Sequence, residues 1–201
     1  METRGFIGRR PRAEVAHRVP PGQHETTEFP VLSIGPTPLI DMPRWALSVK
    51  LQGKLMARMD WEQFTSLENS RWQVDIHCVT RWSKFDTKWR GISLDTIIAH
   101  VGMGDVPAYL SAVSLDGYST NIPTADLCGS RAMIATHYED EPLTRHHGGP
   151  ARLLVPHLYF WKSAKWVCEL NFTDTEVQGF WETRGYHNYG NPFAEQRFDG
   201  E

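Results

Sequence analysis

Apolar and polar residues alternate along several short stretches of this 201-residue chain. Alternation puts every second side chain on the same face of an extended backbone, so it predicts β-strands that are buried on one side. We expect such strands over residues 45–51, 73–79, 109–115, 131–137 and 165–172.

Helical signals are shorter and fewer. Ser93 can cap a helix over residues 94–101, whose apolar side chains fall on one stripe, and Gly102 can end it. Asp60 can cap a second short helix that runs to Leu67. Because strands outnumber helices and do not alternate with them regularly, the pattern predicts a mixed, strand-rich α+β fold.

The first 27 residues differ from the rest of the chain. They are polar and basic, and Pro20, Pro21 and Gly22 interrupt any regular pattern. A chain of 201 residues has room for one substantial domain and little more. We therefore expect an extended or disordered arm over residues 1–27 and a single domain over residues 28–201.

The composition argues against several classes of protein. A formal net charge of −3 gives no general attraction to nucleic acid or to an acidic membrane, and no apolar run is long enough to predict a membrane span. The three cysteines are far apart and form no Cys-x-x-Cys pair, which suits a reducing compartment. Arg9 and Arg10 are followed by charged residues rather than by the apolar core of an export signal, so we expect a cytoplasmic protein.

Cys78 carries the most candidate chemistry. It ends the strand expected over residues 73–79, and a turn rich in His, Lys and Arg follows it. Clustered cations favour a thiolate, which serves as a nucleophile or as a ligand for a soft metal. The alternative is that Cys78 is a small buried hydrophobic residue, as most free cysteines are. The local sequence leaves these alternatives open.

A second group of polar residues surrounds the Gly-Gly-Pro sequence at 148–150. His147 and Arg152 flank it and can donate hydrogen bonds to an anion, while the two glycines would let the backbone approach a bulky group. The loop at 162–166 carries two lysines, and its amides can form a nest that binds an anion. The alternative is a solvated hairpin with ordinary surface cations.

Taken together, these segments resemble the sulfite-oxidase-like molybdopterin oxidoreductases, and most closely the small soluble bacterial branch without a haem domain. Residues 75–84 match the cysteine segment of that branch, and residues 147–166 look like its second signature. Segments near both ends are also similar, at 20–23, 29–36 and 179–188.

The resemblance implies a mixed α+β domain that buries one molybdopterin with its molybdenum. It implies that Cys78 is the single protein ligand to molybdenum. Arg81, three residues after Cys78, is our candidate for steering or stabilising an anionic oxygen of the substrate. His77 and Trp82 are expected to shape the pocket wall or to support the sulfur. The other residues expected at the cofactor are Ser114, His147, Arg152, Ser163, Ala164, Lys165 and the segment 31–35.

The activity implied is two-electron oxygen-atom transfer on a small oxo-sulfur or oxo-nitrogen compound, either sulfite oxidation or sulfoxide-type reduction. Sulfite oxidases of the family carry paired arginines after the cysteine, whereas this chain has only Arg81 there. No cysteine set for haem or iron–sulfur binding is present, so a separate electron-transfer protein is expected. Two alternatives are a non-catalytic scaffold or carrier of the same fold, and a cysteine-nucleophile enzyme with His77 or His147 as base.

Overall fold

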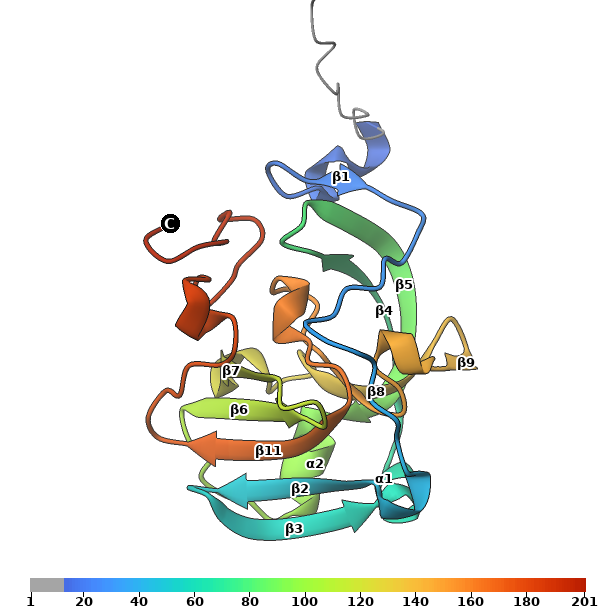
Figure 1. Ribbon diagram of the computed structural model, residues 1–201, viewed down its shortest axis with the longest axis vertical. Coiled ribbons are helices and arrows are strands. Elements are labelled where there is room, and N and C mark those ends of the chain that lie inside the picture. Colours follow the sequence, from blue (N-terminus) through green and yellow to red (C-terminus); the bar gives the residue numbers. More distant parts are fainter. Residues whose placement is uncertain (1–12) are drawn as a thin grey trace, which may run out of the picture.

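The computed structural model describes residues 13–201, which form two β-sheets with short helices around them (Figure 1). The first sheet contains β1 (His24–Glu25), β4 (Ser70–His77), β5 (Trp82–Ser93), β8 (Met133–Tyr138), β9 (Glu141–Pro142) and β10 (Arg152–Leu154). The second sheet contains β2 (Ala46–Leu51), β3 (Lys54–Asp60), β6 (Tyr109–Ser114), β7 (Ser119–Pro123) and β11 (Val167–Thr173). The predicted strand-rich α+β fold is confirmed.

The two predicted helix starts are confirmed. Asp60 forms a capping box at the start of α1 (Trp61–Thr65), and the Ser93 hydroxyl accepts a hydrogen bond from the Thr96 amide at the start of α2 (Leu94–His100). α1 ends at Thr65, two residues before the predicted end. The remaining helical segments are 3₁₀ turns: η1 (Ala13–Arg18), η2 (Met42–Arg44), η3 (Thr124–Asp126), η4 (Arg145–His147), η5 (Phe160–Lys162) and η6 (Glu182–Arg184).

The cation-rich turn expected after Cys78 is much shorter than predicted. It ends at Trp82, where β5 begins and pairs with β4 on one side and β8 on the other. Thr87 and Trp89 of β5 are buried, while Lys88 between them is exposed. The cations therefore occupy the outward-facing positions of a half-buried strand. The strand was missed because these charged residues interrupt the run of apolar residues by which a strand is recognised. The edge strand β3 was also missed, because most of its side chains are exposed.

The segment from β10 to β11 connects the two sheets. β10 pairs with β8 in the first sheet, and β11 lies between β2 and β6 in the second. The amide of Leu153 donates to the carbonyl of Ala164, and the amide of Val167 donates to that of Ala151, so the crossing chain folds back on itself. This crossing is the part of the fold that builds the site described below.

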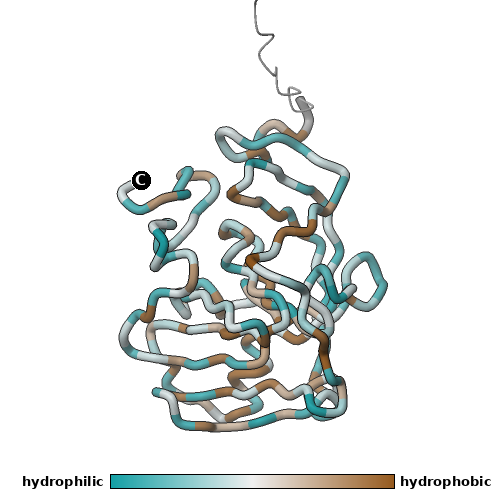
Figure 2. Tube along the Cα trace, viewed as in Figure 1, coloured by the Kyte–Doolittle hydropathy of each residue, from teal (hydrophilic) through white to brown (hydrophobic). Residues whose placement is uncertain are grey.

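Two apolar cores support the sheets. The larger one packs α2 against the second sheet, with Leu47 and Leu170 among its fully buried residues. The smaller one lies on the first sheet and contains Cys78, Trp82 and Phe160. Figure 2 shows hydrophobic and hydrophilic positions alternating along the strands of the second sheet, which is the pattern of a sheet with one buried face.

Part of the expected N-terminal arm is packed on the domain. β1 pairs in parallel with the start of β5, and the Arg18 guanidinium forms ion pairs with Asp75 and Asp86. Residues 1–12 of the arm lie outside the described residues, so the division of the chain at residue 27 stays a prediction. Within residues 13–201, no helix has the length and apolar character that crossing a membrane requires.

A substitution at Gly91 tests whether the close spacing of β5 and β8 is required for stability. A Cβ at this position would lie 2.1 Å from the Ile134 carbonyl oxygen and 2.6 Å from the Ala135 Cα, so Gly91→Ala forces the strands apart. We expect it to lower the free energy of unfolding by about 3 kcal/mol, measured by urea denaturation. Gly104→Ala is the matched control, because its Cβ meets nothing within 4 Å; equal losses in both variants would contradict the expectation.

Candidate functional site

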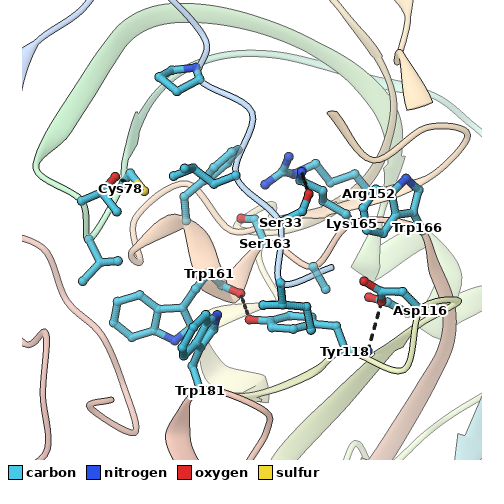
Figure 3. A pocket seen from close by; sticks show the side chains of 18 of the residues that line it. Ser33, Cys78, Asp116, Tyr118, Arg152, Trp161, Ser163, Lys165, Trp166 and Trp181 are labelled. Atoms are coloured by element: carbon cyan, nitrogen blue, oxygen red, sulfur yellow. Dashed lines mark hydrogen bonds between the residues drawn. The ribbon is translucent and has the colours of Figure 1, made fainter. Parts of the chain in front are cut away.

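A cavity of about 320 Å³ lies where the chain crosses from the first sheet to the second. Cys78 lies at one side of it, and Lys165, Trp166 and Asp116 lie at the other (Figure 3). The lining residues come from segments far apart in the sequence, within 29–34, 78–82, 114–118, 152–166 and 181–186.

Cys78 begins a tight turn between β4 and β5. Its amide donates to the carbonyl of Trp82 at 2.9 Å, and its carbonyl accepts from the amide of Arg81 at 3.0 Å. The Thr80 hydroxyl lies 3.1 Å from the sulfur and donates to it. The turn thus buries a thiol that is only 6% exposed and leaves it in the wall of the cavity.

The sequence predicted that the cations following Cys78 would favour its thiolate, and this prediction is wrong. Burial raises the pKa of Cys78 above its ordinary value, and the hydrogen bonds from Thr80 offset this only in part. The cation whose field lowers this pKa is Arg152, which is distant in sequence, rather than the cations of β5. A buried thiol with a raised pKa is a poor free nucleophile, whereas a metal ion can displace its proton.

Arg152 is a buried cation without a carboxylate partner among the described residues. Its Nη1 donates to the His147 carbonyl at 3.0 Å, and its guanidinium lies 3.9 Å from the centre of the Phe160 ring. Burial lowers the pKa of Arg152 to about 9, so it stays charged at neutral pH. A desolvated cation that lines a cavity is a site for an anion.

The loop after η5 completes the end of the cavity opposite Cys78. Ser163, Ala164 and Lys165 all line it. The Lys165 ammonium donates to the Ser33 hydroxyl at 2.9 Å and to the His146 carbonyl at 2.8 Å, and burial lowers the pKa of Lys165 to about 8. Lys162 does not contribute charge here, because it is buried behind the cavity in an ion pair with Glu182.

Three residues predicted from the sequence do not line the cavity. Arg81 lies in the turn with a positive φ of 74° and is exposed. Its side chain is not part of the cavity wall beside the thiol. His77 is buried behind the turn, where its Nδ1 lies 2.8 Å from the Ser83 hydroxyl and burial lowers its pKa to about 4. His147 stacks on Phe29 with ring centroids 4.1 Å apart, and so supports a wall of the cavity.

The two glycines before Pro150 allow close packing against neighbouring segments of the same chain. A Cβ on Gly149 would lie 2.1 Å from the Leu143 carbonyl oxygen, and one on Gly148 would lie 3.1 Å from the Lys165 Cα. The close approach expected for a bulky ligand is therefore an approach to neighbouring backbone. Neither glycine lines the cavity.

Aromatic side chains form the part of the lining that the sequence did not predict. Tyr118 donates from its hydroxyl to the Trp161 carbonyl at 2.6 Å, and Trp181 packs against Tyr186 with ring centroids 4.7 Å apart. All four line the cavity, together with Phe29. The high tryptophan content was the available signal, but these residues show no periodicity that would bring them together.

No cluster of three or more His, Cys, Asp or Glu side chains within residues 13–201 could hold a metal ion by itself. A metal bound at Cys78 would therefore take its other ligands from a bound molecule. A single buried thiol and an unneutralised buried cation in one cavity suit proteins that bind an anionic cofactor carrying its own metal.

The chain belongs to the family of the oxidoreductase molybdopterin binding domain, whose model matches residues 34–181. It is 38% identical over 194 residues to the uncharacterized oxidoreductase YuiH of Bacillus subtilis (strain 168), over 96% of this chain and 98% of that protein. The chain is therefore a molybdopterin-binding oxidoreductase, which removes the scaffold alternative.

Longer relatives share the domain. Human mitochondrial sulfite oxidase is 25% identical over 168 residues, which cover 79% of this chain and 30% of that protein. YedZ1 of Azospira oryzae, whose name describes a protein-methionine-sulfoxide reductase subunit, is 29% identical over 119 residues, covering 59% of this chain and 45% of that protein. The sulfane dehydrogenase SoxCD of Paracoccus pantotrophus shows the same fold, with a TM-score of 0.61 and 19% identity over 70% of this chain and 41% of that one.

The cavity fits the cofactor that the family binds. Within the described part of the chain, the Arg152 Nε, the Ser114 hydroxyl and the Trp82 indole nitrogen are buried without a hydrogen-bond partner. All three residues line the cavity. Buried donors are normally satisfied, so these groups are arranged for a polar ligand.

Arg152→Met tests whether the buried charge serves the fold or a ligand. No carboxylate of the described residues offsets the desolvation of Arg152, so we expect the cofactor-free protein to keep its stability or to gain up to about 2 kcal/mol. Urea denaturation measures this. Arg197→Met is the matched control, because Arg197 is also buried but donates to Glu195 and to the Pro21 carbonyl, and should lose about 1–3 kcal/mol. An equal loss in the two variants would argue for a structural role of Arg152.

Proposed function

We propose that this oxidoreductase holds molybdenum through Cys78 and transfers an oxygen atom from a small neutral oxide, such as a sulfoxide or an N-oxide. The observation that carries the proposal is the cavity with a buried thiol at one side and the buried guanidinium of Arg152 in its wall. The cofactor, when bound, supplies two-electron oxygen-atom chemistry at molybdenum, which cycles between Mo(VI) and Mo(IV).

The residues of the chain divide the work of holding this cofactor. Arg152 and Lys165 would neutralise its phosphate, with the amides of the 163–165 loop as further donors. Ser114 and Trp82 would donate to the polar edge of the pterin, since both have buried donors that lack a partner among the described residues. His147 would act indirectly. Its ring stacks on Phe29, and its backbone carbonyl accepts a hydrogen bond from the Arg152 guanidinium.

Charge in the cavity supports a neutral substrate. Arg152 and Lys165 are the cations among the described lining residues, and Asp116 adds a carboxylate. A dianionic phosphate would use up both cations, which leaves no positive charge for a second anion. Around Cys78 the lining is largely aromatic, and such walls suit an oxide that carries apolar groups.

Sulfite oxidation is the second candidate. The kinship with sulfite oxidase supports it, and so does the field of Arg152, which reaches the Cys78 thiol. The exposed position of Arg81 weighs against it, because the single arginine of the cysteine segment lies outside the cavity.

Reduction of an oxide needs a source of electrons. The S–O or N–O bond breaks, two electrons and two protons are consumed, and the oxygen leaves as water. The described lining contains no further redox group, so we propose a separate electron-transfer protein as the electron donor. We also propose a cytoplasmic location, because three widely spaced cysteines suit a reducing compartment.

Cys78→Ser tests the ligand assignment. In protein from a host that makes the cofactor, we expect molybdenum to fall from about one per chain to less than about a tenth of that, because the thiolate bond is lost. Elemental analysis measures it. Cys168→Ser is the control, since the Cys168 thiol donates to the Val113 carbonyl and the residue does not line the cavity. Full molybdenum content and activity in Cys78→Ser would overturn the assignment.

The choice of substrate is tested by kcat/KM on the wild-type protein. We expect kcat/KM for a neutral sulfoxide, with a reduced dye as electron donor, to exceed that for sulfite, with an oxidised dye as acceptor, by about tenfold or more, since an uncompensated anion is excluded from the cavity. A higher kcat/KM for sulfite would make the second candidate the function.

A further inference from the structure

The turn that carries Cys78 is held by a segment outside the family match. That match begins at residue 34, yet the Gln23 side-chain amide donates to the Cys78 carbonyl at 2.9 Å. The amide of His24 donates to the Arg81 carbonyl at 2.9 Å, at the other end of the same turn. The N-terminal segment therefore holds the turn at two points.

A chain of hydrogen bonds fixes the orientation of the Gln23 amide. The Ser83 hydroxyl donates to the Gln23 Oε1 at 3.3 Å, and the His77 Nδ1 lies 2.8 Å from the same hydroxyl. A hydroxyl has a single hydrogen, so His77 must be the donor in its contact with Ser83. Each donor in this chain polarises the next, and the last one is the Gln23 Nε2 that points at Cys78.

The C-terminal segment closes over this network. The Arg197 Nη2 donates to the Pro21 carbonyl at 3.0 Å, and the Phe193 ring packs edge-on against His77 with centroids 5.5 Å apart. Gly22 packs against Arg197, where a Cβ would lie 3.3 Å from the guanidinium Nη2. Residues 21–24 and the C-terminal segment thus meet behind the candidate metal ligand.

We propose that Gln23 is a positioning residue for Cys78, because its amide holds the carbonyl of the turn that sets the direction of the thiol. This rests on the proposed role of Cys78 as the molybdenum ligand. Gln23 does not line the cavity, and it acts through the backbone of Cys78. Without it, that carbonyl keeps only the hydrogen bond from the Arg81 amide.

The variant Gln23→Leu removes the amide and keeps a side chain of similar size. Cys78 is only 6% exposed in the cavity wall, so its rate of alkylation should rise when the turn loosens. In the full chain without cofactor, we expect iodoacetamide to modify Cys78 about threefold to tenfold faster in Gln23→Leu, the factor for one lost hydrogen bond. Peptide mass analysis separates Cys78 from Cys128 and Cys168.

In the molybdenum-loaded chain, partly reduced to Mo(V), we expect Gln23→Leu to change the EPR signal, because the hydrogen bond that holds the Cys78 turn would be lost. Gln73→Leu is the matched control: Gln73 lies on the same strand pair, is exposed, and hydrogen-bonds Asp86 through its amide. Its alkylation rate and EPR signal should equal those of the wild type.

Ser83→Ala probes the same chain of hydrogen bonds if Gln23→Leu does not fold. It should speed alkylation in the same direction, and the double variant should be no faster than Gln23→Leu alone. Wild-type alkylation rates and EPR signals in Gln23→Leu, or in Ser83→Ala where that variant replaces it, would overturn the proposal. The proposed function fails separately, if molybdenum loading gives Cys78 no protection from alkylation in the wild type.

Discussion

The site depends on the burial of the Arg152 guanidinium at the junction of the two sheets. Removing a cation from water costs several kcal/mol, and the His147 carbonyl and the Phe160 ring offset only part of this. Since no carboxylate of the described residues pairs with Arg152, an anion in the cavity is the natural counter-charge. In the proposed function, that anion is the phosphate of the cofactor.

Topology explains why the thiol and this cation share one cavity. Cys78 lies at the end of β4, and Arg152 lies on β10, which joins the same sheet through β8. After β10 the chain turns through η5 and enters the second sheet as β11, beside Ser114 of β6. One crossing connection thus brings the 163–165 loop and the thiol to the same cavity, although the two are more than eighty residues apart in sequence.

Local signals in the sequence predicted local structure well. The caps at Asp60 and Ser93 were predicted correctly because the capping side chain and the amide it binds are only three residues apart. The alternating strands were predicted because alternation also depends on neighbouring residues alone. The cations after Cys78 misled the interpretation, because closeness in sequence is not closeness in space when alternate residues of β5 face outward. Arg81 lies in the turn that follows Cys78 but is exposed, whereas Arg152, distant in sequence, is the cation that lowers the pKa of the Cys78 thiol. The local pattern predicted Arg152 as a donor to an anion, and only the resemblance to a family predicted which anion.

The aromatic walls and the support behind Cys78 were beyond the sequence for a different reason. Trp181, Tyr186 and Arg197 belong to a C-terminal stretch with little regular structure, so no periodicity indicates where it packs. This stretch reaches the N-terminal segment near Pro21, and together they enclose the back of the ligand turn. Sequence similarity defines a domain over residues 34–181, yet Gln23 and Tyr186 both lie beyond it. The unit that contacts the Cys78 turn is therefore larger than the unit that similarity detects, and a domain cut at those limits would lose β1 and these contacts while keeping the other strands of both sheets.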